Sequence, residues 1–203
     1  MDNVVYLVKD SQMPNLYIIS GCNGAGKTTA SFTILPEMLD CREFVNADEI
    51  ARGLSPFQPE TVAVEAGRIM LQRIEELLKK QEEFAIETTL ATRSYVQTIR
   101  KAKEKDYSIT LVYFWLNSPD LAIARVKRRV SEGGHNIPEE VIRRRYKKGI
   151  HNLFKLFIPI CDYWIIIDNS QNPYKIITER QEDQELHIQN ENIWNKLKIL
   201  SNE

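Results

Sequence analysis

Residues 21–28 have the sequence Gly21-Cys22-Asn23-Gly24-Ala25-Gly26-Lys27-Thr28. An apolar run at residues 16–20 comes directly before this stretch and predicts a buried strand. Residues 26–39 have the pattern of a helix. Only 8 of the 203 residues are glycine, and three of them fall in this stretch. A glycine-rich turn between a strand and a helix, ending in Gly-Lys-Thr, matches the phosphate-binding loop, or P-loop, at every fixed position.

The P-loop pattern predicts a site for a nucleoside triphosphate. Glycines let successive backbone N–H groups turn toward phosphate oxygens, and the helix N-terminus adds positive charge. Lys27 is expected to bind the β- and γ-phosphates, and the Thr28 hydroxyl to bind Mg²⁺. The expected cofactors are therefore ATP and Mg²⁺. The predicted nucleotide-binding residues of the loop are Gly21, Cys22, Asn23, Gly24, Ala25, Gly26, Lys27, Thr28 and Thr29.

The composition excludes several other classes of protein. A hydrophobic fraction of 43% is enough for a sizeable core. With 27 basic and 28 acidic side chains, the chain has no overall charge that would attract nucleic acid or an anionic membrane. The three cysteines form no paired motif, no secretory signal is visible, and no apolar stretch is long enough to span a bilayer. These features predict a cytoplasmic protein.

Strands and helices alternate along the chain. The predicted strands lie at residues 16–20, 43–46, 84–88, 108–116 and 162–168. Because the segments between them have helical periodicity, the pattern predicts an α/β three-layer sandwich with a mainly parallel five-stranded sheet. We interpret residues 1–203 as a single domain. A hairpin and a last helix near residues 191–200 would form a C-terminal appendage, at about residues 173–203.

The chain lacks the marks of two large P-loop classes. A GTPase would carry Asn-Lys-x-Asp, but Asn195-Lys196 is followed by Leu197-Lys198. A motor or transporter ATPase would show an apolar strand ending in Asp-Glu, whereas the nearest match ends in Asp168-Asn169 and comes late in the chain. A small kinase with a basic lid and a carboxylate near the acceptor fits better.

Two groups of polar residues follow predicted strands, where ligands bind in open α/β sheets. Asp48 follows the second strand and could accept a proton from a substrate hydroxyl, or it could cap the next helix. Glu87, Thr88 and Thr89 lie at the end of the third strand, with Arg93 shortly after them. These four could bind the hydroxyls of a sugar or polyol, or they could be a helix cap beside a solvated carboxylate.

The segment 125–148 is strongly basic, with nine Lys or Arg and three Glu. Gly133-Gly134-His135 interrupts its two predicted helices. A mobile basic lid would neutralise charge on the transferring phosphoryl group and exclude water. The alternatives are a solvated charged face, or a nucleic-acid site, which the single aromatic residue Tyr146 makes less favourable.

Taken together, these motifs resemble the zeta-toxin family of P-loop kinases, in the branch described as predicted ABC-type ATPases. The resemblance covers about residues 14–170. Its matching pieces are GCNGAGKTT, VNADEIARGLSP, ETTLATRS, SITLVYFWLNSP, IARVKRRVSEGGHNIPEEVIRRRY and DYWIIIDNS.

The resemblance implies a kinase-like fold with a lid, related to chloramphenicol phosphotransferase and to shikimate and adenylate kinases. Characterised zeta toxins phosphorylate UDP-N-acetylglucosamine, so a nucleotide amino sugar is the implied acceptor. A separate antitoxin protein is the implied partner. On this pattern Lys27 holds phosphates, Asp48 is the general base and Glu87 lies by the acceptor.

Further residues take their roles from the same resemblance. Arg125 and Arg129 would stabilise the transferring phosphoryl group, and Asn169 would lie near the adenine. The second catalytic arginine of the family falls at Gly133-Gly134-His135, so His135 or one of the arginines 143–145 would replace it. Two other functions stay open: a nucleotide-binding protein with little turnover, and a polynucleotide 5′-hydroxyl kinase.

Overall fold

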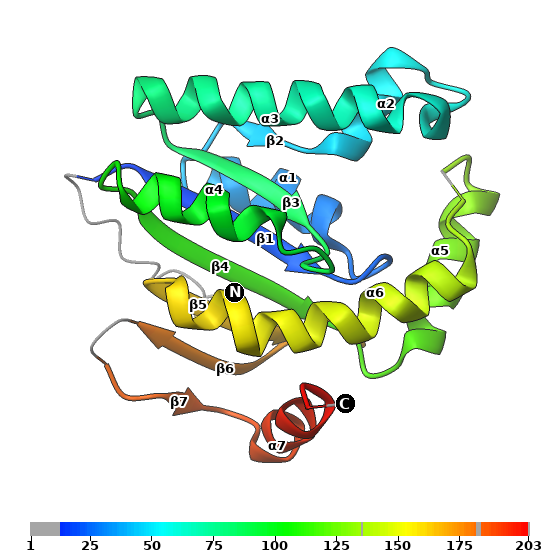
Figure 1. Cartoon of the computed structure of the whole chain (residues 1–203). Helices are drawn as coiled ribbons and strands as arrows, with labels where there is room; N and C mark the ends of the chain where they lie inside the picture. The colour runs from blue at the N-terminus through cyan, green and yellow to red at the C-terminus, as the bar shows by residue number, and fades with distance from the viewer. Residues whose placement is uncertain (1–12, 135, 182–183, 203) are drawn as a thin grey trace.

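The structure, a computed structural model, describes residues 13–134, 136–181 and 184–202. Its centre is one seven-stranded sheet with the strand order β2-β3-β1-β4-β5-β6-β7 (Figure 1). Strands β2, β3, β1, β4 and β5 run parallel, while β6 and β7 are antiparallel to their neighbours. The strands are β1 (Asn15–Gly21), β2 (Phe44–Val45), β3 (Phe84–Thr88), β4 (Ser108–Trp115), β5 (Tyr163–Asp168), β6 (Lys175–Gln181) and β7 (His187–Ile188).

Helices cover the sheet on both faces. In Figure 1, α4 and α6 lie in front of the sheet and α1 lies behind it, while α2 and α3 lie beside β2. Three short helical segments, η1 (Pro59–Val62), η2 (Leu153–Phe157) and η3 (Ile158–Ile160), complete the connections. The helices are α1 (Lys27–Met38), α2 (Ala47–Leu54), α3 (Ala63–Lys80), α4 (Ser94–Lys103), α5 (Pro119–Ser131), α6 (Glu139–Asn152) and α7 (Glu191–Leu200).

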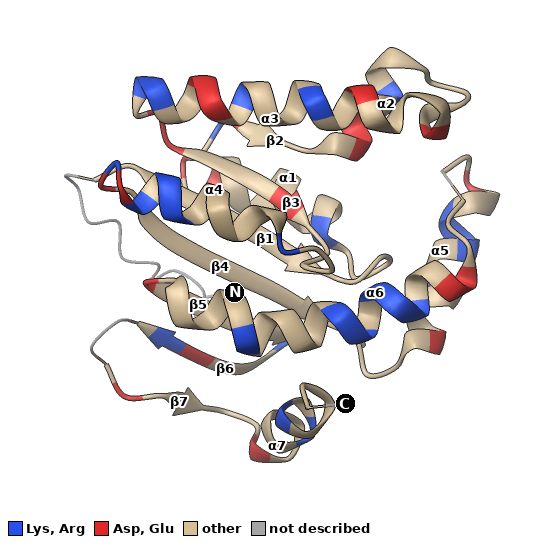
Figure 2. Ribbon diagram, in the orientation of Figure 1, with Lys and Arg blue, Asp and Glu red and all other residues tan. Residues whose placement is uncertain are grey.

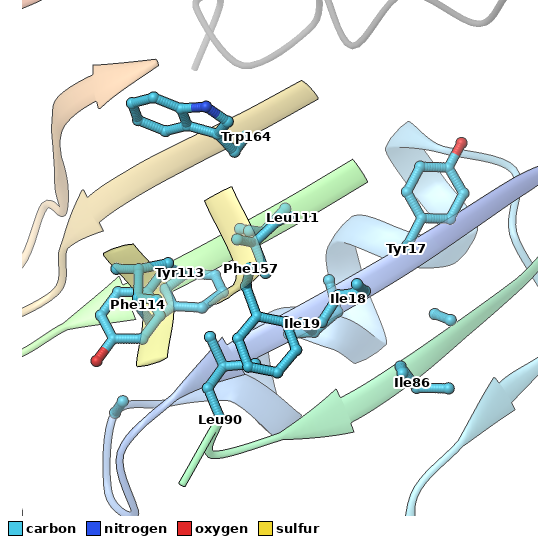
Figure 3. Packing of buried hydrophobic residues seen from close by; sticks show 14 of the residues in the cluster. Tyr17, Ile18, Ile19, Ile86, Leu90, Leu111, Tyr113, Phe114, Phe157 and Trp164 are labelled. Carbon is cyan, nitrogen blue, oxygen red and sulfur yellow. The ribbon is translucent and has the colours of Figure 1, made fainter. Parts of the chain in front are cut away.

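The core explains why the central strands are almost continuously apolar. All seven residues of β1 and seven of the eight residues of β4 are buried. A parallel sheet with helices on both faces has no solvated side, so its strands need no polar alternation. Figure 3 shows side chains of β1, β3 and β4 packed together with Phe157 of η2 and with Leu90.

The parallel register brings the carboxyl ends of four strands together. Ile19 of β1 pairs with Glu87 of β3, and Gly21 pairs with Phe114 of β4. Val45, the last residue of β2, pairs with Ile86. The P-loop after β1, the segment after β2 and the end of β3 therefore meet at one edge of the sheet, where parallel α/β folds bind ligands.

The α/β fold is confirmed, but the prediction of five strands was wrong. Residues predicted as a separate C-terminal hairpin form β6 and β7 and extend the same sheet. β6 pairs with β5 from Tyr163↔Gln181 to Asp168↔Lys175, with an irregularity between Ile166 and Ile167. Each strand signal is local, whereas the choice of partner depends on the free edge of β5. The sequence pattern of the hairpin does not contain that information.

The segment beyond β7 is tied to the sheet by aromatic side chains. Trp194 of α7 stacks on Trp164 of β5 with ring centroids 6.0 Å apart, and its ring lies 5.2 Å from that of Phe154. None of the helices in the described part of the chain combines the length and apolar character needed to cross a membrane.

Candidate active site

The P-loop connects the end of β1 to the first residue of α1, as the sequence predicted. Gly24 and Gly26 have φ values of 76° and 84°, a region that side chains disfavour. A Cβ on Gly24 would lie 2.7 Å from the carbonyl oxygen of Ala122, and one on Gly26 would lie 2.7 Å from Nδ2 of Asn169. The loop therefore needs glycine both for its backbone conformation and for its close neighbours.

Lys27 lies buried at the first turn of α1. Its Nζ donates a hydrogen bond to the carbonyl oxygen of Cys22 at 3.1 Å and lies 3.5 Å from Oε1 of Glu87. The ammonium group is thus folded back over the P-loop, where a bound phosphate chain would lie. Burial raises the pKa of the Cys22 thiol to about 11 against the opposing effect of Lys27, so this thiol stays protonated near neutral pH.

Glu87 joins three parts of the site. Its Oε2 accepts hydrogen bonds from the Thr28 hydroxyl at 2.8 Å and from Nδ2 of Asn46 at 2.9 Å. Only 8% of its side chain is exposed, and its other oxygen faces Lys27. Glu87 therefore contacts both Lys27 and Thr28, the P-loop side chains that are expected to bind phosphate and metal. The position of Glu87 beside the acceptor stays a prediction; its described contacts are with Thr28, Asn46 and Lys27.

Asn46, not Asp48, caps α2. The Asn46 Oδ1 accepts hydrogen bonds from the backbone N–H groups of Asp48 at 2.8 Å and Glu49 at 3.4 Å. The hypothesis that the Asp48 side chain caps this helix was therefore wrong, because Asn46 is the capping residue. The Asp48 carboxylate is exposed and lines an open pocket together with Thr28.

This pocket has a volume of about 490 Å³ and lies between α2, η1 and the end of α5. Thr28 comes from the P-loop, Asp48 and Arg52 come from α2, and Arg129 and Gly134 come from α5 and the turn after it. A second pocket of about 570 Å³ shares part of this lining, including Arg52 and Gly134. The first pocket therefore has both Asp48 and the P-loop residue Thr28 in its lining.

The glycines of the basic segment end α5. The N–H of Gly133 donates to the carbonyl oxygen of Val130 at 3.0 Å, and the N–H of Gly134 donates to that of Arg129 at 2.9 Å. With a φ of 88° at Gly133, this is the hydrogen-bond pattern of a Schellman helix end. The predicted interruption between two basic helices is present, and α6 begins at Glu139. His135 lies outside the described residues.

Several basic side chains of the segment are paired with carboxylates. Figure 2 shows bands of Lys and Arg along α5 and α6. The pairs are Lys127–Glu139 at 2.6 Å, Arg128–Glu132 at 3.1 Å and Arg143–Asp120 at 2.6 Å. These pairs are exposed, so each contributes little to stability. Part of the segment therefore has the solvated character that we considered as an alternative.

The two predicted catalytic arginines, four residues apart on α5, have different neighbours. Arg129 lines the pocket that contains Asp48. Arg125 lies against the loop itself, since its Cβ is 3.3 Å from where a Cβ on Gly24 would be, and its guanidinium donates to the carbonyl oxygen of Ser170 at 3.2 Å. Asn169 also contacts the P-loop, through a 2.8 Å hydrogen bond from Nδ2 to the carbonyl oxygen of Ala25.

The structure does not bring every predicted residue to the pocket. The Thr88 hydroxyl accepts a hydrogen bond from the N–H of Leu90 at 3.1 Å, and Arg93 is exposed at the start of α4. Thr88, Thr89 and Arg93 are absent from the described lining of both pockets, and Thr29 is exposed on α1.

Two contacts at the site were not predicted: the sequence did not single out Asn46, and it offered Arg145 only as one of several candidates for the second catalytic arginine. Asn46 holds Glu87, and Arg145 of α6 donates to Oδ1 of Asn23 in the P-loop at 3.2 Å. The available signal was position: Asn46 stands at the end of a predicted strand, and Arg145 lies within the basic segment.

The chain matches known proteins in sequence. The family model described as "Zeta toxin" matches residues 4–172. An uncharacterized protein of Haemophilus influenzae is 34% identical over 128 residues, which make up 62% of this chain and 88% of that protein.

Solved structures share the fold at low sequence identity. A structure of the PezAT chromosomal toxin-antitoxin system of Streptococcus pneumoniae has a TM-score of 0.65 at 16% identity, covering 97% of this chain and 89% of that one. The AvrRxo1-ORF1:-ORF2 structure with ATP has a TM-score of 0.73 at 17% identity, covering 93% of this chain. This chain spans 64% of the length of that second protein. These likenesses confirm the P-loop kinase fold, and the family match shows that the chain belongs to the zeta toxin family.

Proposed function

We propose that this protein is an ATP-dependent kinase that transfers the γ-phosphate to a hydroxyl group of a small molecule. The observation that carries the proposal is the shared pocket of Thr28, Asp48 and Arg129. It combines the P-loop residue Thr28, the carboxylate of Asp48, which does not cap α2, and the guanidinium group of Arg129. These are the groups that phosphoryl transfer to an alcohol requires.

Each group has a defined task in the proposed reaction. The P-loop N–H groups and Lys27 bind the phosphates, and Asp48 accepts the proton of the acceptor hydroxyl. The hydroxyl oxygen then forms a bond to the γ-phosphorus, while the bond from that phosphorus to the β,γ-bridging oxygen breaks and ADP leaves. Arg129 faces the same pocket and would stabilise negative charge on the transferring group.

The residues around Thr28 suit Mg²⁺. The Thr28 hydroxyl and the Glu87 carboxylate offer hard oxygen ligands 2.8 Å apart. No cluster of three or more His, Cys, Asp or Glu side chains forms a metal site within the described residues. A phosphate-bound Mg²⁺ needs only one or two protein ligands, because phosphates and water supply the rest. When bound, Mg²⁺ would neutralise phosphate charge, with Thr28 and Glu87 holding it.

The proposed acceptor and partner come from the family. A nucleotide amino sugar is the first candidate acceptor, as for characterised zeta toxins. A separate antitoxin protein is the proposed partner, supported by the fold shared with the PezAT toxin-antitoxin system. Since ATP is the donor, the reaction is proposed to occur in the cytoplasm.

The acceptor can be found directly. The purified protein is incubated with ATP, Mg²⁺ and a metabolite extract, and mass spectrometry is used to find species that gain one phosphate. UDP-N-acetylglucosamine and an RNA oligonucleotide with a 5′-hydroxyl are tested separately. Phosphorylation of a small alcohol supports the proposal. Phosphorylation of the RNA alone would replace it with a polynucleotide kinase, and ATP binding without any product would replace it with a nucleotide-binding protein.

Replacing Glu87 with Gln is expected to raise the Mg²⁺ concentration for half-maximal activity about tenfold or more, because the variant loses one negative oxygen beside Thr28. Initial rates measured against free Mg²⁺ at fixed ATP test this expectation. Glu37→Gln makes the same chemical change at an exposed position of α1 and serves as the control. An unchanged Mg²⁺ dependence in Glu87→Gln would remove Glu87 from the proposed metal site.

A further inference from the structure

Three consecutive arginines of α6, at positions 143–145, differ in exposure and in their hydrogen-bond and ion-pair partners. Arg143 is exposed and pairs with Asp120 at 2.6 Å. Arg144 is exposed and has no ion-pair or hydrogen-bond partner among the described residues. Arg145 is half-buried, and its Nη1 donates to Oδ1 of Asn23 at 3.2 Å. Of these three, only Arg145 is described in contact with the P-loop.

Asn23 is a buried residue of the loop, with only 5% of its surface exposed. It lies directly after Cys22, whose carbonyl oxygen accepts the hydrogen bond from Lys27. It lies directly before Gly24, which packs against Ala122 of α5. Asn23 therefore lies in the same short stretch of backbone as the carbonyl group that accepts from Lys27, so a contact that holds Asn23 restrains this stretch.

The part of α6 that carries Arg145 is held firmly against the sheet. The neighbouring Tyr146 is buried and donates from its hydroxyl to the carbonyl oxygen of Leu116 at 2.7 Å. Nδ2 of Asn152 donates to the carbonyl oxygen of Leu90 at 2.7 Å. A Cβ on Gly149 would lie only 2.7 Å from the carbonyl oxygen of Thr89, so the helix approaches the chain closely there. These contacts fix the backbone from which the Arg145 side chain extends.

Three contacts from other parts of the chain therefore hold the P-loop. α5 approaches Gly24, Asn169 donates to the carbonyl oxygen of Ala25, and Arg145 donates to Asn23. We propose that Arg145 is a positioning residue, which holds the P-loop through Asn23 in the conformation that binds nucleotide phosphates. Fixing the loop in advance lowers the entropy lost on phosphate binding. This inference rests on the proposed nucleotide function, but it does not depend on the identity of the acceptor.

Binding of ADP, measured by calorimetry, tests the proposal. Arg145→Ala and Asn23→Ala are each expected to raise the Kd for ADP about tenfold, the effect of losing one hydrogen bond to a charged group. Because both variants break the same contact, the double variant is expected to bind ADP about as weakly as the weaker single variant. Arg145→Lys, which keeps a positive donor, is expected to bind ADP better than Arg145→Ala.

Two controls separate positioning from general damage to the fold. Arg100→Ala, the same chemical change at an exposed position of α4, is expected to leave the Kd for ADP unchanged. The affinity for adenosine, which has no phosphate, is expected to be the same in all variants.

Three results would overturn the proposal. The first is ADP binding by Arg145→Ala at the wild-type Kd, and the second is an equal loss of adenosine and ADP affinity in that variant. The third is a double variant in which the two single effects multiply to about a hundredfold. A wild-type protein that binds ADP no better than adenosine would instead overturn the proposed function itself, together with this inference.

Discussion

Lys27→Ala is expected to lower the rate of phosphoryl transfer about a thousandfold or more, in line with the loss of one charged group that stabilises a transition state. Lys27 is buried within the P-loop, 3.1 Å from the carbonyl oxygen of Cys22 and 3.5 Å from Glu87. Its removal leaves the Glu87 carboxylate without that cation beside the phosphate site. Without Lys27 the negative charge of Glu87 would weaken the attraction of the site for the γ-phosphate, so both binding and transfer are affected. Steady-state assays with saturating acceptor measure the effect.

A second substitution guards against a loss of fold. Lys27→Met keeps most of the length of the side chain but not the charge, and it is expected to be as inactive as Lys27→Ala. Lys79→Ala removes a lysine from the exposed surface of α3, outside the basic segment, and is expected to retain full activity. Circular dichroism confirms that each variant is folded. Turnover close to the wild-type value in folded Lys27→Met would refute the active-site assignment.

Asp48→Asn is expected to lower kcat by about a hundredfold to ten-thousandfold, the usual contribution of a general base. The substitution preserves the shape of the side chain and removes its ability to take the proton. The affinity for ATP should change little, because Asp48 lies on α2, outside the P-loop, and its proposed partner is the acceptor hydroxyl. The stability of α2 should also be retained, because the side chain of Asn46 supplies its N-cap. Rapid-quench kinetics and ATP titration measure the two quantities separately.

The matched control is Asp106→Asn, the same chemical change at an exposed turn before β4. It is expected to leave kcat and ATP affinity at their wild-type values. If folded Asp48→Asn transferred phosphate at the wild-type rate, another group would have to accept the proton. A loss of ATP affinity with unchanged kcat would instead assign Asp48 to nucleotide binding.

The parts of the fold that follow from local rules could be predicted from the sequence. The P-loop is an example, because its conformation depends on glycines at fixed spacing and on the strand and helix that flank it. The central strands are another, since burial on both faces makes each a continuous apolar run. The pairing of β6 with β5 cannot be read from the sequence pattern of either segment. The prediction therefore gave five strands, whereas the sheet has seven.

The candidate site shows the same division. Local sequence left Asp48 with two equal hypotheses, because Asn and Asp are both good helix caps. Only the geometry shows that Asn46 caps α2 and also donates to Glu87. Similarly, the spacing along α6 could not separate Arg145 from its two neighbours. That distinction depends on which face of the helix meets the P-loop, 122 residues away in the chain.

The two outermost strands of the sheet have a consequence for association. β2 and β7 contain only two residues each, so they offer few unpaired backbone groups to another chain. Very short edge strands are one way in which proteins avoid aggregation through edge-to-edge pairing. A binding partner has equally little to gain by adding a strand of its own to β2 or β7. We therefore expect regulatory proteins to recognise this molecule through its helices and loops rather than by β-augmentation.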